Sequence, residues 1–253
     1  MVPREHGAYG QLVFPLLTPV AIGRPSLAAA ALIAAVVCAF LAHEPLVVLL
    51  GRRGSRAARE HGDEARRWLL ATTGAAALGL ALAAAAMTSD ARRALTTPAV
   101  LAVAAGAVVV SGREHTVGGE ILSGLALAST ALPVGAAAGL DPLRARTCAA
   151  AFGAGFTAAT ACVHAVIACT RHPPALAARA AAVVSTAALV VVVRQLSQTD
   201  AIAAAGPWAA LPLCAGGVLL AAMPPSARHL RRVGWTLVGA TVACGLILVF
   251  GLR

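Results

Sequence analysis

Apolar residues occur along this chain in long blocks separated by short polar segments. A block of about twenty residues is long enough to cross the roughly 30 Å hydrocarbon core of a bilayer as a helix. There the backbone must satisfy its own hydrogen bonds, which favours helices, and the blocks lack the period-two alternation of a membrane β-barrel. The pattern therefore predicts an all-α, polytopic transmembrane helical bundle.

About nine spans are expected, and the first is predicted to be short and kinked because it contains Pro15 and Pro19. The longest polar stretch, residues 51–67, is too short to build a core of its own, so residues 1–253 should form a single integral membrane domain. The expected spans are residues 8–22, 26–50, 67–88, 96–112, 118–140, 145–170, 175–197, 204–223 and 232–252.

Composition supports this class of protein and limits its partners. The chain is 59% hydrophobic with a mean hydropathy of +0.83, and only 12% of its residues are charged. The net charge is +10, and all twenty basic residues are arginines, which lie at the ends of spans. Anionic lipid headgroups or a phosphorylated substrate suit such arginines, whereas nucleic acid does not. The six cysteines lie in or beside spans without a CxxC pair, which is typical of small buried hydrophobes.

Arginine counts predict the orientation. The N-terminus and the connections after the second, fourth, sixth and eighth spans should lie on one side of the membrane. Thirteen of the twenty arginines fall on that side and seven on the other. The positive-inside rule therefore places the N-terminus in the cytoplasm and the C-terminus outside.

The same partition sorts the other ionisable residues. All seven histidines and seven of the ten acidic residues fall on the predicted cytoplasmic side, which indicates that any chemistry takes place there. The histidines are His6, His43, His61, His115, His164, His172 and His229; the acids are Glu5, Glu44, Glu60, Asp63, Glu64, Glu114 and Glu120.

Some of these residues lie within or near spans, where ionisable groups are costly and mark candidate sites. His43 and Glu44 precede Pro45 near the end of the second span. Two further sets are spaced along single helix faces that should point into the bundle. One comprises Thr157, Thr160, His164 and Arg171, and the other Glu120, Ser123 and Thr130.

Neighbouring glutamate and histidine residues raise the possibility of a metal site. Such neighbours recur at Glu5-His6, His43-Glu44, Glu60-His61 and Glu114-His115. Carboxylate and imidazole together can bind zinc, iron or manganese. The alternative is that these groups are hydrated, interfacial and paired with nearby arginines. No HExxH, Walker, GxSxG or Rossmann motif is present.

Two segments carry a family resemblance. The opening Pro3-Arg4-Glu5-His6-Gly7-Ala8-Tyr9-Gly10 and the stretch His43-Glu44-Pro45-Leu46 resemble the YwiC-like family of bacterial membrane proteins. The resemblance extends over most of the chain, to Arg231–Trp235. It implies a bacterial cell (inner) membrane location and no settled activity.

The layout also resembles, more distantly, the UbiA superfamily of intramembrane prenyltransferases. That resemblance implies nine helices, an N-terminus inside, and two aspartate-rich motifs that hold Mg²⁺ against a prenyl diphosphate. The corresponding places here are His43-Glu44 and residues 164–172, and Thr116–Glu120 is similar to a Gly-Glu segment of the superfamily. Neither NxxxD nor DxxxD is present at these places, so the chemistry does not transfer directly.

The first functional hypothesis is a UbiA-like enzyme that acts on an isoprenoid or lipid, by prenyl transfer or terpene cyclisation from a prenyl diphosphate. The expected catalytic residues are Glu44, His43, His164 and Glu120. The expected substrate-binding residues are Arg52, Arg53, Arg113 and Arg171, and the candidate ligands for Mg²⁺ or another divalent metal are Glu44, Glu5, His6, Glu114, His115 and Glu120.

Two other classes of function remain open. His164 and Glu120 could form a proton or ion relay in a transporter, although the outer half of the chain shows no continuing polar path. The protein could also be a non-catalytic membrane assembly factor.

Overall fold

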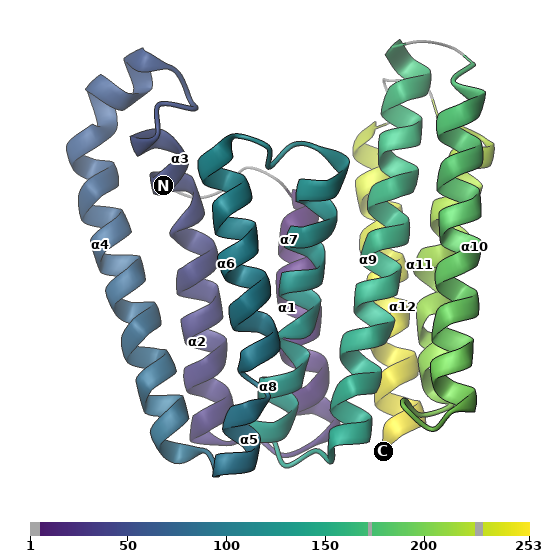
Figure 1. Ribbon diagram of the computed structural model, residues 1–253, viewed down its shortest axis with the longest axis horizontal. Helices are drawn as coiled ribbons and strands as arrows, with labels where there is room; N and C mark the ends of the chain where they lie inside the picture. Colours follow the sequence, from purple (N-terminus) through teal and green to yellow (C-terminus); the bar gives the residue numbers. More distant parts are fainter. Residues whose placement is uncertain (1–5, 172–173, 226–229) are drawn as a thin grey trace.

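The computed structural model describes residues 6–171, 174–225 and 230–253, and these form a bundle of helices that run side by side (Figure 1). The helices are α1 (His6–Ile22), α2 (Leu27–Leu41), α3 (His43–Leu49), α4 (Ser55–Ala86), α5 (Ser89–Arg93), α6 (Thr96–Ser111), α7 (Val117–Ser129), α8 (Ala131–Ala137), α9 (Pro142–Arg171), α10 (Leu176–Gln198), α11 (Ala205–Ala222) and α12 (Leu230–Leu252).

These helices confirm a polytopic bundle. Within the described ranges, eight segments are long and apolar enough to cross a membrane, and α1 adds a shorter apolar helix over Ala8–Ile22. Pro15 and Pro19 both lie inside α1, as expected for the shortest span. The protein is therefore a multi-pass membrane protein, with its segments in the order that hydropathy predicts.

Helices break at Ala42 and Thr130, inside two predicted spans, and at Leu95, directly before the predicted span 96–112. Each break lies three residues before a proline, namely Pro45, Pro98 and Pro133. A proline ring clashes with the carbonyl four residues earlier and lacks an N–H, but it is tolerated in the first turn of a helix. A new helix therefore starts just ahead of each proline, and the continuous spans predicted over 26–50 and 118–140 are corrected to helix pairs.

The N-terminal part of α4 is a second correction. Residues 51–67 were expected to form a polar connection, but the helix already begins at Ser55 and contains 32 residues. At 1.5 Å per residue it is about 48 Å long, so it extends beyond a hydrocarbon core of roughly 30 Å. An ion pair between Arg56 and Glu60 and a contact between His61 and Glu64 lie along its exposed first turns, at helical spacing.

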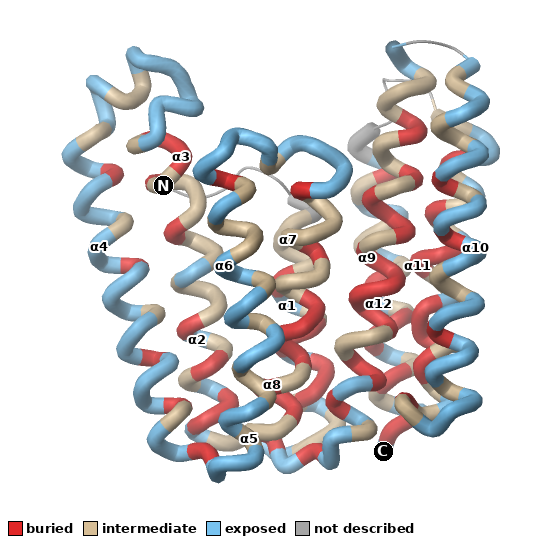
Figure 2. Tube along the Cα trace, viewed as in Figure 1, coloured by how far each residue is buried: buried red, intermediate tan, exposed pale blue. Residues whose placement is uncertain are grey.

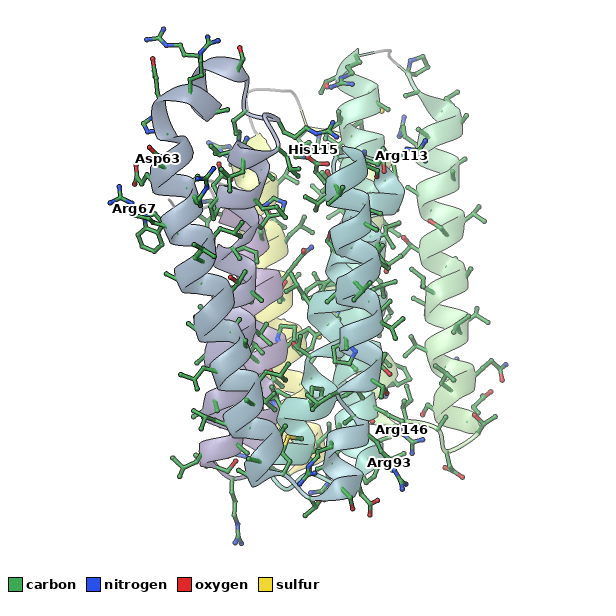
Figure 3. All side chains as sticks on the ribbon, turned by 60° about the vertical axis from the view of Figure 1, so that its left-hand side comes forward. Asp63, Arg67, Arg93, Arg113, His115 and Arg146 are labelled. Carbon is green, nitrogen blue, oxygen red and sulfur yellow. The ribbon has the colours of Figure 1, made fainter. Side chains whose placement is uncertain are left out.

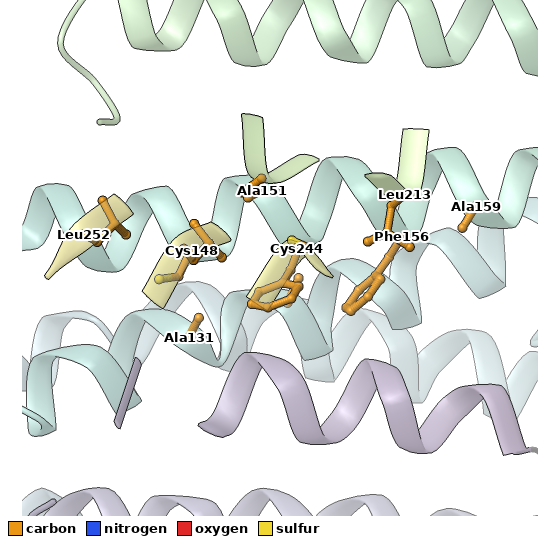
Figure 4. Close-up of a cluster of buried hydrophobic side chains, with 12 residues drawn as sticks. Ala131, Cys148, Ala151, Phe156, Ala159, Leu213, Cys244 and Leu252 are labelled. Carbon is orange, nitrogen blue, oxygen red and sulfur yellow. The ribbon is translucent and has the colours of Figure 1, made fainter. Parts of the chain in front are cut away.

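Helix α9 lies at the centre of the packed core (Figure 2). Its rings Phe152 and Phe156 stack with centroids 5.7 Å apart, and Leu213 of α11 and Cys244 of α12 belong to the same buried cluster (Figure 4). Leu213 packs directly over Gly155, where an added side chain would overlap it. Small residues thus let α9 and α11 approach closely, which is how helices associate in a bilayer.

The peripheral helices α4, α6 and α10 expose long apolar faces. Leu70 of α4, Val103 of α6 and Val184 of α10 are each at least two-thirds exposed. In a membrane these faces lie against lipid, so their exposure is consistent with stable helices. The six cysteines, all in the described part of the chain, are free thiols.

Side chains donate hydrogen bonds to backbone carbonyls at the ends of several helices. The guanidinium of Arg253 donates to the carbonyl of Ala21 at the end of α1, and that of Arg179 donates to Ala221 at the end of α11. The hydroxyl of Ser26, which precedes α2, donates to Ala137 at the end of α8. These bonds satisfy carbonyls that have no partner within their own helix.

Candidate functional site

Ionisable residues gather at one end of the bundle, called here the polar end, which contains the α3–α4 connection (Leu50–Gly54) and the α6–α7 connection (Gly112–Thr116). Asp63, Arg113 and His115 lie toward this end, whereas Arg93 and Arg146 lie at the opposite end (Figure 3). Helix α3, which begins with His43, and the C-terminal part of α9, which contains His164, also lie in the polar half (Figure 1). The ends at which Asp63, Arg113, His115, Arg93 and Arg146 lie agree with the partition derived from the arginine counts.

The central feature of the site is a contact between Glu120 of α7 and His164 of α9. Glu120 Oε2 lies 2.9 Å from His164 Nε2, a hydrogen bond that joins residues far apart in sequence. Glu120 stands in the first turn of α7, which Thr116 caps by accepting a hydrogen bond from the N–H of Gly119. The pair is partly shielded, with side-chain exposures of 41% for Glu120 and 23% for His164.

Polar groups continue from this pair toward the middle of the bundle. Thr160, one turn before His164 on α9, is buried, and Ser123 on α7 is half-buried and donates to the carbonyl of Gly119. Gln11 of α1 belongs to the same region, because a side chain built at Gly124 would lie 3.9 Å from Gln11 Oε1. Sequence reasoning missed Gln11, although it is the one amide in an otherwise apolar first span.

An ion pair joins Glu44 of α3 to Arg53 of the α3–α4 connection. Arg53 Nε donates to Glu44 Oε1 at 2.9 Å and Arg53 Nη2 donates to Glu44 Oε2 at 2.7 Å. The side chain of Glu44 is 16% exposed and that of Arg53 is 45% exposed. This two-pronged geometry is the strongest form of arginine–carboxylate contact, so both oxygens of Glu44 are committed to the guanidinium.

Arg52 points the other way along the same connection. Its Nη2 donates to the carbonyl of Val110 at 3.1 Å, and its guanidinium lies over Gly112, where a side chain would overlap it. Gly112 has a φ of +71°, a left-handed conformation that favours glycine. Arg52 thereby caps the carbonyl end of α6 with a positive charge, the favourable sign at that end of a helix.

The α6–α7 connection brings a third acidic group to the polar end. One carboxylate oxygen of Glu114, Oε2, is buried and has no hydrogen-bond partner among the described residues. The neighbouring residues Arg113 and His115 are exposed. A buried carboxylate oxygen without a partner is costly, which makes Glu114 a candidate ligand residue.

The predicted metal set is only partly gathered. Among the residues that the structure describes, no three His, Cys, Asp or Glu side chains are grouped so that they could hold a metal ion. Glu5 lies outside the described residues, and the side chain of His6 is not described either. Because Glu44 is engaged by Arg53 and Glu120 by His164, the described donors do not fit a Mg²⁺ site, and the metal assignment stays a prediction.

The other predicted residues are placed as follows. His43 is half-buried beside Glu44 at the start of α3, and Arg171 is exposed at the end of α9. Of the predicted catalytic residues, Glu120 and His164 contact each other, whereas Glu44 contacts Arg53, a predicted substrate-binding residue.

The Glu120–His164 contact has a defined chemical capacity. In the neutral imidazole with its proton on Nε2, the Nε2–H group of His164 donates a hydrogen bond to Glu120. Nδ1 then has a free lone pair. A carboxylate that fixes the tautomer of an imidazole in this way also stabilises the imidazolium ion. The pair can therefore accept or donate a proton at Nδ1 for a molecule bound beside α9.

The fold and this polar end define a polytopic helical membrane protein with a candidate acid–base pair inside the bundle. A model of the YwiC-like protein family matches residues 2–136, more than half of the chain. The chain therefore belongs to the YwiC-like family, as its opening segment and the His43-Glu44-Pro45-Leu46 stretch predict. No significant match was found among curated proteins or solved structures.

Proposed function

We propose that this protein is an intramembrane enzyme that acts on an isoprenoid or lipid at the polar end, with Glu120 and His164 as its acid–base pair. The observation that carries the proposal is the 2.9 Å contact between these two side chains across α7 and α9. An ionisable pair inside a membrane bundle is costly to maintain and is by default a functional site.

The distribution of charge supports a substrate that has an apolar body and an anionic head. The bundle offers apolar surface along its length, and the arginines Arg52, Arg53 and Arg113 lie at the polar end. Guanidinium groups match the geometry of phosphate oxygens. Prenyl transfer or terpene cyclisation from a prenyl diphosphate, in a UbiA-like arrangement, is the reaction class that uses these groups together.

In that reaction the diphosphate leaves with the electron pair of its bond to carbon, and arginines at the polar end bind the departing anion. The allylic cation that remains is attacked by an acceptor or by a double bond of the same chain. His164 Nδ1 then takes the proton that is lost when the product becomes neutral, and Glu120 stabilises the imidazolium. General-base assistance of this kind contributes about a hundredfold to ten-thousandfold in rate.

The test is turnover by the purified protein in nanodiscs, supplied with geranyl, farnesyl or geranylgeranyl diphosphate in the presence and absence of Mg²⁺. Diphosphate release and extractable products are measured for the wild type, His164→Ala and Glu120→Gln. The matched control is His61→Ala, an exposed histidine on α4. We expect both site variants to lose at least about a hundredfold in rate while the control is unchanged.

Equal turnover by His164→Ala and the wild type would refute the acid–base assignment. Absence of turnover with every diphosphate, in folded wild-type protein, would refute prenyl chemistry.

A proton-coupled carrier is the second candidate, favoured by the same ionisable pair. A relay needs polar groups that continue to the opposite end of the bundle. The described ionisable residues of that end, including Asp90, Asp141 and Arg144, lie on its exposed surface. The carrier would be favoured if the protein conducts protons into liposomes and Glu120→Gln does not. The enzyme would be favoured if the liposomes do not leak protons while the protein turns over substrate.

A further inference from the structure

Three polar side chains within the helices make no hydrogen bond to the part of the chain that the structure describes. They are called here the polar track and comprise Gln11 of α1 and Thr157 and Thr160 of α9. By contrast, the hydroxyls of Thr186 and Thr241, which are also buried, each donate to a carbonyl one turn earlier in their own helix, at 2.8 Å. Polar groups inside proteins are nearly always hydrogen-bonded, so three neighbouring groups without such a bond require an explanation.

The polar track lies at one level of the bundle. A Cβ added at Gly124 of α7 would be 3.9 Å from Gln11 Oε1 and 3.4 Å from the Cβ of Phe156. Phe156 is one helical turn before Thr160 on α9, so Gln11 lies beside that turn. Gly124 is one turn beyond Glu120 on α7. The polar track is therefore about one helical turn further into the bundle than the contact between α7 and α9 that Glu120 makes.

An apolar layer closes the inner end of the polar track. Phe152 and Phe156 stack on each other and are almost fully buried, and Phe14, three residues beyond Gln11 on α1, packs against the same cluster (Figure 4). Toward the polar end the track meets Glu120, whose side chain is 41% exposed. The track is thus reached from the polar end and is closed by aromatic side chains, which suits a binding site better than a relay across the membrane.

The hydroxyl of Thr160 is accessible although the residue is buried. Thr160 is 7% exposed. Among the described residues that are not exposed, Glu114 Oε2 is the one side-chain oxygen or nitrogen that is both completely sealed and without a partner. The Thr160 hydroxyl therefore reaches open surface, and Gln11 is half-buried. Side chains that are buried, unpartnered and still accessible can each make a hydrogen bond to a ligand.

We propose that the polar track binds the hydroxyl group of a neutral lipid alcohol. An amide offers two donors and an acceptor, and a threonine hydroxyl both donates and accepts, so together they complement a group that does both. The track carries no charge, whereas Arg52, Arg113 and Arg171 are exposed at the polar end. A charged head would leave these arginines for an uncharged site, at the cost of its hydration.

The acid–base pair distinguishes a hydroxyl from a carbonyl. Glu120 engages Nε2 of His164, so Nδ1 is the nitrogen that remains as an acceptor, one helical turn from Thr160. A hydroxyl group can donate to Nδ1 while it accepts from the polar track. A ketone or ester carbonyl has no proton to donate and leaves Nδ1 unmatched.

The role of this alcohol in a reaction rests on the proposed function, whereas its binding is argued from the hydrogen-bonding groups alone. In the proposed reaction the alcohol is the acceptor of the prenyl group. Its oxygen bonds to C1 of the prenyl chain, the bond between C1 and the diphosphate oxygen breaks, and the diphosphate leaves with the electron pair. The hydroxyl proton passes to His164 Nδ1, and the product is a prenyl ether.

Displacement of a tritiated alcohol from the full chain in nanodiscs tests the site. The probes are farnesol and dioleoylglycerol, two neutral lipid alcohols, each displaced by its unlabelled form so that label dissolved in the bilayer does not count. Farnesyl methyl ether has the same chain but no hydroxyl proton. We expect it to compete about tenfold more weakly than farnesol, because it leaves His164 Nδ1 without a donor.

Variants assign the role of the polar track. Gln11→Met and Thr160→Val keep the size of the side chain and remove its hydrogen-bonding groups, and each should weaken farnesol binding about tenfold. The matched control is Thr241→Val, because the Thr241 hydroxyl already donates to Leu237 within α12, and it should bind farnesol as the wild type does. Thr160→Val should also unfold at the same detergent fraction as the wild type, since its hydroxyl makes no bond to the described residues.

Four results would overturn the proposal. They are the absence of displaceable binding of both alcohols, which indicates that water alone meets the polar track; equal competition by the methyl ether; unchanged farnesol affinity in Gln11→Met or Thr160→Val; and a destabilised Thr160→Val, which indicates a structural role for the hydroxyl. A failure of the proposed function has a different signature. In that case His164→Ala keeps its turnover, or no variant turns over, while the wild type still binds farnesol more tightly than Thr160→Val does.

Discussion

Replacing Gly79 of α4 by alanine tests whether close backbone packing holds the outer helix to α2. A Cβ at Gly79 would lie 2.9 Å from the carbonyl oxygen of Ala31 and 3.2 Å from the Cβ of Ala35. Both neighbours belong to the rigid part of α2, so a rotamer change cannot relieve the contact. The two helices must instead separate by several tenths of an ångström to reach an ordinary carbon–oxygen distance of about 3.4 Å.

The expected cost follows from this geometry. Overpacking of a close contact destabilises a protein by about 1 to 3 kcal/mol. Relative to a Gly→Ala change elsewhere in α4, we expect the lower half of that range, about 1 to 2 kcal/mol, because α4 has lipid on its outer side and can shift outward. The contact is nevertheless important for α4, whose buried residues are Ala65, Thr72, Gly79 and Ala83.

The assay is reversible unfolding in mixed micelles with increasing sodium dodecyl sulfate, followed by tryptophan fluorescence, to which Trp68 on α4 itself contributes. Gly74→Ala is the matched control, because a side chain at Gly74 meets nothing within 4 Å. This control should be neutral or slightly stabilising, since alanine favours a helix by about 1 kcal/mol over glycine. If Gly79→Ala and Gly74→Ala unfold at the same detergent fraction, the packing argument for α4 is wrong.

Two further predictions concern polar groups that close helix ends. Arg179→Gln removes the guanidinium that donates to the carbonyl of Ala221 at 2.8 Å, and it should destabilise the bundle by about 2 kcal/mol in the same unfolding assay. Its control is Arg194→Gln, which changes an exposed residue of the same helix and should have no measurable effect. Thr147→Val removes the hydroxyl that accepts the N–H of Ala203 at 2.8 Å and should cost about 1 to 3 kcal/mol, and Thr147→Ser should restore most of the loss. A stable Thr147→Val variant would mean that the Ala203 N–H finds another acceptor.

Much of the fold could be predicted from the sequence, because in a bilayer hydropathy dictates where a helix crosses. The order of the spans and the side of each connection follow from the apolar blocks alone. The helix breaks at Ala42, Leu95 and Thr130 could also be predicted from the sequence, since each lies three residues before a proline. The start of α4 at Ser55 could not be predicted from hydropathy, because its first turns are charged and are stabilised by exposed ion pairs instead of apolar contacts.

The candidate site was predictable only as separate faces. Helical spacing indicates that His164 and Glu120 each point into the bundle, but their contact depends on the height of α9 relative to α7. That height is determined by small residues such as Gly153, which packs against Leu125, and no single-sequence pattern reports it. For the same reason Gln11 was missed, since its position beside Gly124 comes from the packing of α1 against α7.

The Glu44–Arg53 and Glu120–His164 contacts bear on how far the UbiA analogy can be carried. In that superfamily, carboxylates at the corresponding helix ends hold metal ions, so they must be free of basic partners. Here Glu44 is bound by Arg53 through both oxygens, and Glu120 is bound by His164. A metal at this end must therefore displace a guanidinium or an imidazole before it gains a ligand, and displacing a two-pronged arginine costs a strong charge-assisted contact. An incoming phosphate would have to break the same contact to bind Arg53, but Arg52 is bound to the backbone carbonyl of Val110 and not to a carboxylate. The contacts therefore favour an anion-binding role for Arg52 over a metal held by Glu44 or Glu120.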